Sequence, residues 1–168
     1  MKFLNIIIIL SFFILNSCSN NSSNVSENII ENEDIETEMI KVYNEGLEAL
    51  NLGDANYAAK KFNEVEILFP QSDLAPKSAL MAAYSYYSQD YYGDAIAELN
   101  RFLRVYPNYK HTDYVYFLLG LSYYEQIIDE KKDLQSIIKA KEYFEIVKQN
   151  FSNTEYALDA EFKIEYIN

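Results

Sequence analysis

Apolar residues recur along most of this chain in a stripe with offsets of 0, 4, 7 and 11 positions. The stripe occurs as Ala58, Phe62, Val65 and Phe69, as Ala95, Leu99, Phe102 and Tyr106, and as Ala140, Phe144, Val147 and Phe151. Such offsets place side chains on one face of an α-helix. Each stripe is followed at once by Pro70, Pro107 or Ser152, where a helix would end. The pattern predicts three related amphipathic helices.

A second helix is predicted before each of these, because a small residue followed by a bulky one precedes every stripe. The pairs are Gly46-Leu47, Ala83-Tyr84 and Gly120-Leu121, and their small residues lie 37 positions apart. The interval from Ala58 to Ala95 is also 37, whereas that from Ala95 to Ala140 is 45. A fixed period of this length indicates a repeat of helical hairpins. The third hairpin is therefore expected to carry about eight extra residues, around 125–133.

The predicted helices cover residues 37–52, 55–69, 75–89, 92–105, 113–128, 134–150 and 154–166. Ser72 or Asp73, and Thr112, are expected to cap helix N-termini with side-chain oxygens. Pro76 falls in a first turn, where its missing N–H does no harm. The scarcity of Gly (4) and Pro (3) also favours an all-α fold.

The two-helix unit resembles the tetratricopeptide repeat, which has a small residue in its first helix, an Ala opening the second, a bulky residue four later and a Pro at the end. The resemblance covers about residues 38–152 and implies a superhelix of about three hairpins plus one final helix. The first helix of each hairpin would line its concave face. The positions that the family would place in this groove are Tyr43, Leu47, Leu50, Leu80, Tyr84, Tyr87, Tyr114, Phe117, Leu121 and Tyr124.

The stretch from Tyr114 to Tyr124 is apolar all round, so it must contact neighbours on more than one face. Tyrosine suits a binding surface, because its ring is apolar and its hydroxyl is easily hydrated. One interpretation is a groove that binds an extended or helical apolar peptide. The alternative is that these aromatic residues simply pack between repeats.

The N-terminus has the features of a secretory signal over residues 1–17. Lys2 precedes an apolar stretch that is too short to span a bilayer comfortably. Leu15-Asn16-Ser17-Cys18 resembles the bacterial lipobox, which implies diacylglycerol and an N-acyl chain on Cys18; the alternative is an ordinary signal peptide with a coincidental Cys. The polar, acidic residues 18–36 are expected to form a flexible tether, and residues 37–168 the repeat domain.

Charge and composition argue against several classes of function. The net charge of −12 would repel the phosphates of a nucleic acid. Cys18 is the only cysteine and His111 the only histidine, so neither a disulfide within the chain nor a histidine-based metal site is expected. The sequence contains none of the common nucleophile, zinc or phosphate-loop motifs. We therefore predict no catalytic residue, no metal and no enzyme.

The order of finer motifs resembles the BamD family of outer-membrane lipoproteins. The motifs run from Cys18 through Phe69-Pro70 and Ala75-Pro76-Lys77 to Asp113-Tyr114-Val115-Tyr116 and Gly120-Leu121, and they end at Asn153-Thr154-Glu155-Tyr156-Ala157. The most specific part is the run from Asp113-Tyr114-Val115-Tyr116 to Gly120-Leu121.

This resemblance implies a lipid-anchored scaffold on the periplasmic face of the outer membrane. Its partners would be a BamA-type barrel assembly protein, other assembly lipoproteins and unfolded outer-membrane protein substrates. Members of that family have about five repeats, so we expect the docking surface of the later repeats to be largely absent here. The alternative is another tetratricopeptide lipoprotein, such as a pilotin for a pilus or a secretion pore.

Overall fold

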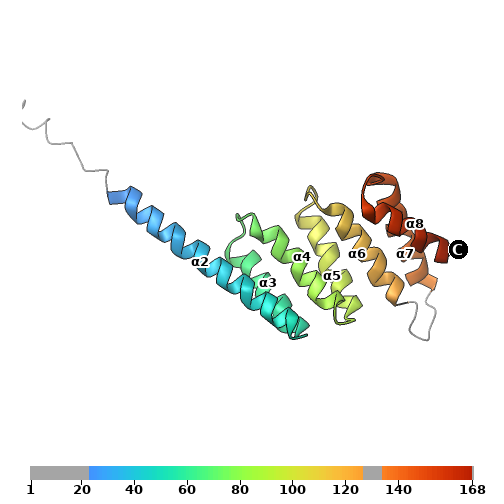
Figure 1. Cartoon of the computed structure of the whole chain (residues 1–168), viewed down its shortest axis with the longest axis horizontal. Coiled ribbons are helices and arrows are strands. Elements are labelled where there is room, and N and C mark those ends of the chain that lie inside the picture. The colour runs from blue at the N-terminus through green and yellow to red at the C-terminus, as the bar shows by residue number, and fades with distance from the viewer. Residues whose placement is uncertain (1–22, 127–133, 168) are drawn as a thin grey trace, which may run out of the picture. The chain divides into compact units, whose positions relative to one another are not determined.

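The computed structural model describes residues 23–126 and 134–167, and over these residues the chain forms only helices (Figure 1). They are α2 (Ser23–Asn51), α3 (Ala55–Leu68), α4 (Leu74–Tyr87), α5 (Tyr92–Val105), α6 (Thr112–Glu125), α7 (Leu134–Asn150) and α8 (Glu155–Ile167). The predicted all-α fold is confirmed. The predicted signal peptide over 1–17, the lipidation site Cys18 and most of the long loop at 125–133 lie outside the described residues.

The helices from Met39 onward pack in consecutive pairs within one compact unit. Each of the helices α3 to α7 contacts the next one along the chain, and α6 also contacts α8. The part of α2 that belongs to this unit shares a buried cluster with α3 and α4. The pairs α2–α3, α4–α5 and α6–α7 are the three predicted hairpins, and α8 is the final helix. This arrangement is consistent with the tetratricopeptide-like superhelix.

The helices that carry the apolar stripes begin and end within one residue of their predicted limits, whereas α2 differs. It begins at Ser23, so helical structure covers most of the segment 18–36 that we expected to be a flexible tether. The sequence between Ser23 and Gly46 contains neither Pro nor Gly. Extending an existing helix costs far less than starting one. Because no Pro or Gly interrupts this segment, the helix extends back to Ser23.

The expected caps are partly correct. At the start of α4, the Ser72 hydroxyl accepts a hydrogen bond from the N–H of Ala75 at 3.1 Å, while Asp73 makes no capping bond. Thr112 was predicted wrongly as a cap. It is the first residue of α6, and its hydroxyl donates to the Tyr109 carbonyl in the preceding turn. The Ser72 hydroxyl also donates to a carbonyl of the preceding turn, that of Phe69 at 2.8 Å, and it acts as a cap because it accepts the Ala75 N–H as well.

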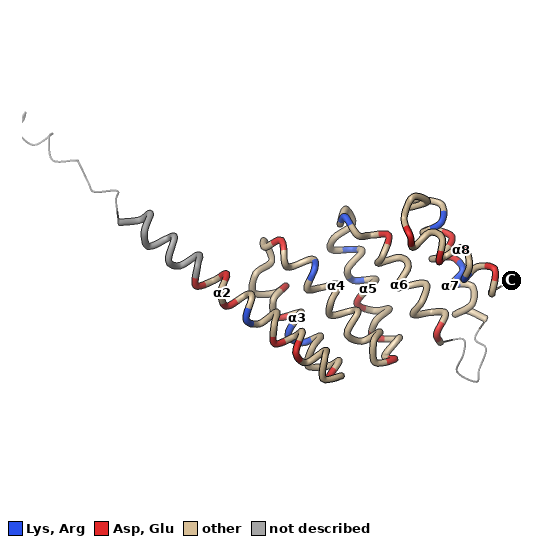
Figure 2. The backbone as a smooth tube through the Cα atoms, in the orientation of Figure 1, with Lys and Arg blue, Asp and Glu red and all other residues tan. Residues whose placement is uncertain are grey.

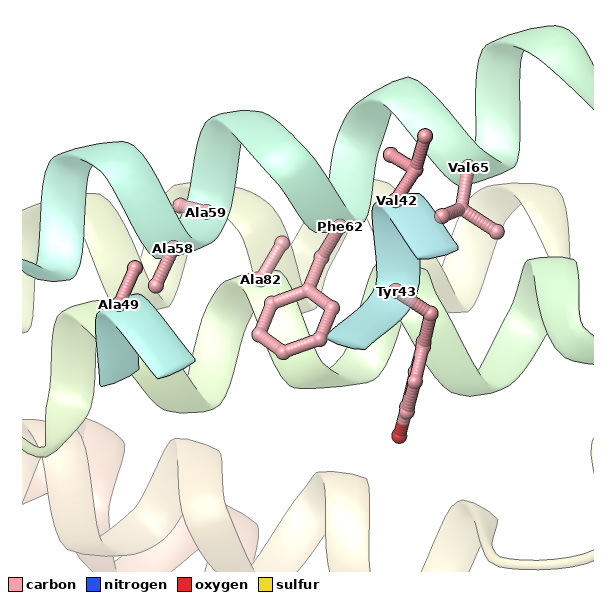
Figure 3. Close-up of a cluster of buried hydrophobic side chains, with 8 residues drawn as sticks. All are labelled: Val42, Tyr43, Ala49, Ala58, Ala59, Phe62, Val65 and Ala82. Atoms are coloured by element: carbon pink, nitrogen blue, oxygen red, sulfur yellow. The ribbon is translucent and has the colours of Figure 1, made fainter. Parts of the chain in front are cut away.

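The apolar stripes form the core between the helices. Figure 3 shows the first cluster, in which the Phe62 side chain of α3 lies among residues of α2 and α4. Phe62, Phe102 and Phe144 are fully buried in their respective clusters. The last residue of each stripe, such as Tyr106, is only half-buried because it lies where the helix ends. The stripes therefore hold each hairpin to its neighbours along the stack.

The first and third hairpins leave no space for a side chain at their predicted small residues, Gly46 and Gly120. A Cβ atom on Gly46 would lie 2.9 Å from the Phe62 ring, and one on Gly120 would lie 2.6 Å from the Phe144 ring. Ala83, at the same position of the second hairpin, shares its cluster with the smaller Leu99. A large side chain on the second helix of a hairpin is thus matched by a small residue on the first helix, so that the core is filled without overlap. This matching accounts for the small residue that recurs in each hairpin.

Successive hairpins are also joined by polar contacts. The Arg101 guanidinium on α5 donates to both carboxylate oxygens of Glu66 on α3, at 2.9 and 2.7 Å, and to Glu98 at 2.8 Å. The Tyr106 hydroxyl donates to Glu66 at 2.9 Å. The hydrogen bond with Glu66 is the main cause that raises the pKa of Arg101 above its usual range. A two-point contact of this kind fixes the orientation as well as the distance of α3 and α5.

Candidate functional site

The ten predicted groove residues lie on the first helices of the hairpins, α2, α4 and α6. Tyr43, Leu80 and Phe117 occupy the same position in successive hairpins and are buried, with exposed fractions of 9, 8 and 8%. The other seven are half-buried: Leu47, Leu50, Tyr84, Tyr87, Tyr114, Leu121 and Tyr124. The row is therefore neither entirely core nor entirely surface.

Three of these residues come together in a cavity of about 570 Å³ between α4 and α6, which we call the first cavity. They are Leu80, Tyr84 and Tyr114. The complete lining is Lys77, Leu80, Met81, Tyr84, Tyr109, Lys110, His111, Tyr114 and Tyr156. It is drawn from α4, from the turn before α6, from α6 itself and from α8.

Two more predicted residues, Phe117 and Tyr124, line a cavity of about 360 Å³ between α6 and α8, the second cavity. The remaining lining residues all come from α8 and are Asp159, Phe162, Lys163 and Tyr166. Sequence reasoning missed them because the family positions were carried over only to the third hairpin. The repeat interval would have found two of them, since Phe162 follows Phe117 by 45 residues and Tyr166 follows Leu121 by 45.

The other five predicted residues pack in the core clusters without lining either cavity. Tyr43 packs edge-on against Phe62 at 5.2 Å, and Leu47 and Leu50 pack against the same cluster. Tyr87 and Leu121 pack against the buried cluster of the second hairpin. For these five, packing between repeats describes the observed contacts, and they line neither of the two cavities.

Aromatic rings form a continuous wall along the two cavities. The Tyr156 ring lies 5.3 Å from that of Tyr114, in the first cavity, and 5.4 Å from that of Phe117, in the second. Burial is the main cause that raises the pKa of Tyr114 and of Tyr156, so both hydroxyls stay protonated at neutral pH. The wall can therefore contact apolar groups with its rings and form hydrogen bonds with its hydroxyls.

The charge of the first cavity is opposite to that of the chain. Lys77, Lys110 and His111 line it, and none of its described lining residues is acidic. The Lys77 ammonium lies 5.3 Å from the centre of the Tyr43 ring, a cation–π contact. Lys77 is the only charged residue of α4 (Figure 2). A cavity with aromatic walls and positive charges at its rim can accommodate an apolar group that carries a carboxylate.

None of the helices in the described part of the chain has the length and hydropathy needed to cross a membrane.

Comparison with known proteins identifies the family to which the sequence is related. Residues 35–168 match the model of the family described as "YfiO: Outer membrane lipoprotein". The chain is similar to the outer membrane protein assembly factor BamD of Caulobacter vibrioides, with 35% identity over 76% of this chain and 42% of the relative. For BamD of Rickettsia prowazekii the identity is 33% over 82% of this chain and 55% of the relative. For BamD of Neisseria meningitidis serogroup B the identity is 32% over 71% of this chain and 49% of the relative.

The chain spans about half the length of the curated relatives that it matches. The matched region nevertheless includes every hairpin of the stack and all residues of both cavities. With the match covering most of its length, the chain belongs to the YfiO/BamD family of outer membrane lipoproteins.

Proposed function

We propose that this protein is a non-enzymatic scaffold for the assembly of outer-membrane β-barrels, and that it binds unfolded barrel polypeptides along the row of cavities on α4, α6 and α8. The matched relatives are named as assembly factors for outer membrane proteins. The observation that carries the proposal is the first cavity, whose aromatic walls and positive rim suit one kind of peptide end.

That peptide end is a C-terminal aromatic residue. Its ring would lie against Tyr84 and Tyr114, which face the cavity from α4 and α6. Its terminal carboxylate would lie towards Lys77 and Lys110. A carboxylate near two ammonium groups at a partly desolvated rim gains more than one in water. The absence of acidic residues from the described lining means that nothing in the cavity would repel it.

Membrane attachment through a lipid on Cys18 completes the proposal. Two or more acyl chains hold a protein stably at a bilayer, whereas one does not. The scaffold would then sit at the periplasmic face of the outer membrane. There it would work with a BamA-type barrel assembly protein and other assembly lipoproteins.

Peptide binding tests the proposal directly. A labelled peptide with a C-terminal Phe should bind, and Tyr84→Ala should weaken binding by about tenfold, as expected for loss of an aromatic contact. Blocking the terminal carboxylate as an amide should weaken it further. Tyr91→Ala is the matched control, because Tyr91 is 48% exposed and lines neither cavity. Helicity measured by circular dichroism should be nearly unchanged in both variants.

Two results would contradict this function. If Tyr84→Ala lowers helicity instead of affinity, that tyrosine belongs to the core and the cavity is not the binding site. If affinity purification from solubilised outer membranes recovers a secretion-pore or pilus component in place of a barrel assembly protein, the pilotin alternative is correct.

A further inference from the structure

Of the three cations that line the first cavity, only Lys77 belongs to a helix. Lys110 and His111 lie on the turn between α5 and α6, whereas Lys77 lies near the start of α4 and is the only charged residue of that helix. A lysine ammonium stands at the end of a flexible four-carbon stem, so a place on a helix does not by itself fix where the charge lies. The contacts of the side chain decide how it meets a ligand.

The Lys77 ammonium lies against a ring of the preceding hairpin. It is 5.3 Å from the centre of the Tyr43 ring on α2, within the range of about 6 Å over which an aromatic face attracts a cation. The ion pairs of the described residues do not include Lys77. No acidic side chain of these pairs therefore competes with the Tyr43 ring for this charge.

The Tyr43 ring is itself held in place by the core. It is 9% exposed and packs edge-on against the ring of Phe62 at 5.2 Å, and Phe62 is fully buried. The Tyr43 hydroxyl points away from the other labelled side chains of this cluster (Figure 3). Because a closely packed interior yields little, this ring cannot follow a moving side chain. It can hold the ammonium near one position.

Tyr109 connects this pair of residues to the rim of the first cavity. Tyr109 lines the cavity together with Lys77, and its ring packs edge-on against the buried Phe102 at 5.4 Å. Burial is the main cause that raises the pKa of Tyr109, while the positive charge of Lys77 acts to lower it and Tyr43 acts, more weakly, to raise it. The three groups are thus neighbours, although they come from α2, α4 and the turn before α6. Tyr43 therefore acts on the first cavity through Lys77, without lining it.

The repeat explains why a residue of the first hairpin comes so close to this cavity. Tyr43 and Lys77 occupy the positions that Leu80 and Tyr114 occupy one period of 37 residues later. Leu80 and Tyr114 both line the first cavity and share one apolar cluster. This pair of positions therefore joins neighbouring hairpins at both steps of the stack, and at the first step it consists of a ring and a cation.

We propose that Tyr43 is a positioning residue for the first cavity, and that its ring holds the Lys77 ammonium where this ammonium binds the terminal carboxylate of a polypeptide. This inference rests on the proposed function, because it needs a carboxylate at the rim. The ammonium has three N–H donors, so it can keep the ring on one side and donate to a carboxylate on another. Part of the entropy of ordering Lys77 is then lost before the ligand arrives, which favours binding.

The test measures by fluorescence anisotropy how strongly the full chain prefers a free carboxylate to an amide at the C-terminal Phe of one peptide. The preference is the dissociation constant of the amide divided by that of the acid. Tyr43→Leu stays apolar but loses the ring, so the preference should fall roughly three- to fivefold and the affinity for the amide should change less than about twofold. Tyr43→Phe keeps a ring and should keep the preference. Tyr57→Leu is the matched control, because the Lys61 ammonium lies 5.7 Å from the centre of the Tyr57 ring and neither residue lines a cavity.

Nuclear magnetic resonance adds a measurement that needs no peptide. Protons above an aromatic ring resonate upfield, so the ε-methylene signal of Lys77, assigned with Lys77→Met, should lie upfield of its position in Tyr43→Leu. Lys77→Met should also lower the preference for the carboxylate, and adding Tyr43→Leu to it should lower the preference no further, because the two residues act as one unit.

The outcomes separate this inference from the proposed function. If the unmodified chain prefers the carboxylate and Tyr43→Leu retains the full preference, Tyr43 does not position Lys77 and the function stands. An ordinary, unshifted Lys77 signal in the unmodified chain would refute the inference even if Tyr43→Leu does not fold. If the unmodified chain binds acid and amide equally, no carboxylate is held at the rim, and both the inference and the carboxylate contact of the proposed function are wrong.

Discussion

Replacing Gly120 by Ala should destabilise the protein, although the same change usually stabilises a helix. Gly120 lies inside α6, where Ala would contribute up to about 1 kcal/mol through helix propensity. However, the new Cβ would lie 2.6 and 2.7 Å from two atoms of the Phe144 ring. Ordinary contacts between carbon atoms are about 3.5–4.0 Å long, so the overlap is about 1 Å.

The magnitude follows from how little the ring can move. Phe144 is fully buried, so it can yield only by displacing its neighbours. Overpacking of a tight core costs about 1–3 kcal/mol, and an overlap of this size belongs at the upper end. After the helix-propensity gain is subtracted, Gly120→Ala should lower the free energy of unfolding by about 2 kcal/mol. For a domain of this size, the melting temperature should fall by roughly 5–10 °C.

Thermal unfolding followed by circular dichroism measures this loss, and Gly93→Ala is the control. Gly93 lies in α5, and a Cβ there would meet nothing within 4 Å, so this variant should be neutral or slightly stabilised. Adding Phe144→Leu to Gly120→Ala should recover part of the loss, because the smaller side chain restores the combination of sizes found at Ala83 and Leu99. If Gly120→Ala is as stable as Gly93→Ala, the close approach of α6 and α7 does not constrain this position.

Three further predictions concern polar groups and the anchor. Arg101→Lys removes the two-point contact with Glu66 and should lower the unfolding free energy by about 1–2 kcal/mol in chemical denaturation, whereas Arg104→Lys at an exposed site should change it by less than about 0.5 kcal/mol. Burial, and then the hydrogen bond to Glu66, raise the pKa of Tyr106 to about 12. The protonated hydroxyl therefore contributes stability that is complete below about pH 10 and lost towards pH 12, so Tyr106→Phe should reduce the fall in melting temperature over that range. Cys18→Ser should move the protein from the membrane fraction to the soluble fraction after cell lysis, and retention in the membrane would contradict a lipid anchor.

The helices were predictable from the sequence because their signal is local and repeated. Each stripe lies in one helix except for its last residue, which directly follows the helix, and a Pro or Ser comes next. The errors occur where the signal is weaker. No Pro or Gly marks the start of α2, so its first turns were not predicted. The Thr112 hydroxyl could bond either to its own helix or to the preceding turn, and it bonds to the Tyr109 carbonyl of that turn.

The candidate site was less predictable, because a position on a helix does not determine what lies opposite to it. All ten predicted residues belong to the core clusters or pack against them, but only half of them also line a cavity. Tyr84 and Tyr87 illustrate the difference: they are one turn apart on α4, yet only Tyr84 lines the first cavity, while Tyr87 packs against the Tyr92 ring at 5.8 Å. Contacts between helices decide such outcomes, and these contacts join residues far apart in the sequence.

The tight packing inside the hairpins and the open cavities between them are physically connected. Gly120 lets the Phe144 ring come close to α6, and that ring supports Phe117 and Tyr124 at centroid distances of 5.8 and 6.4 Å. Those two side chains are the α6 wall of the second cavity. The small residue that the repeat requires thus also determines the position of this wall of the second cavity. A change that displaces Phe144 should therefore alter the second cavity directly, and it can reach the first cavity only through the contacts of Phe117 with Tyr156.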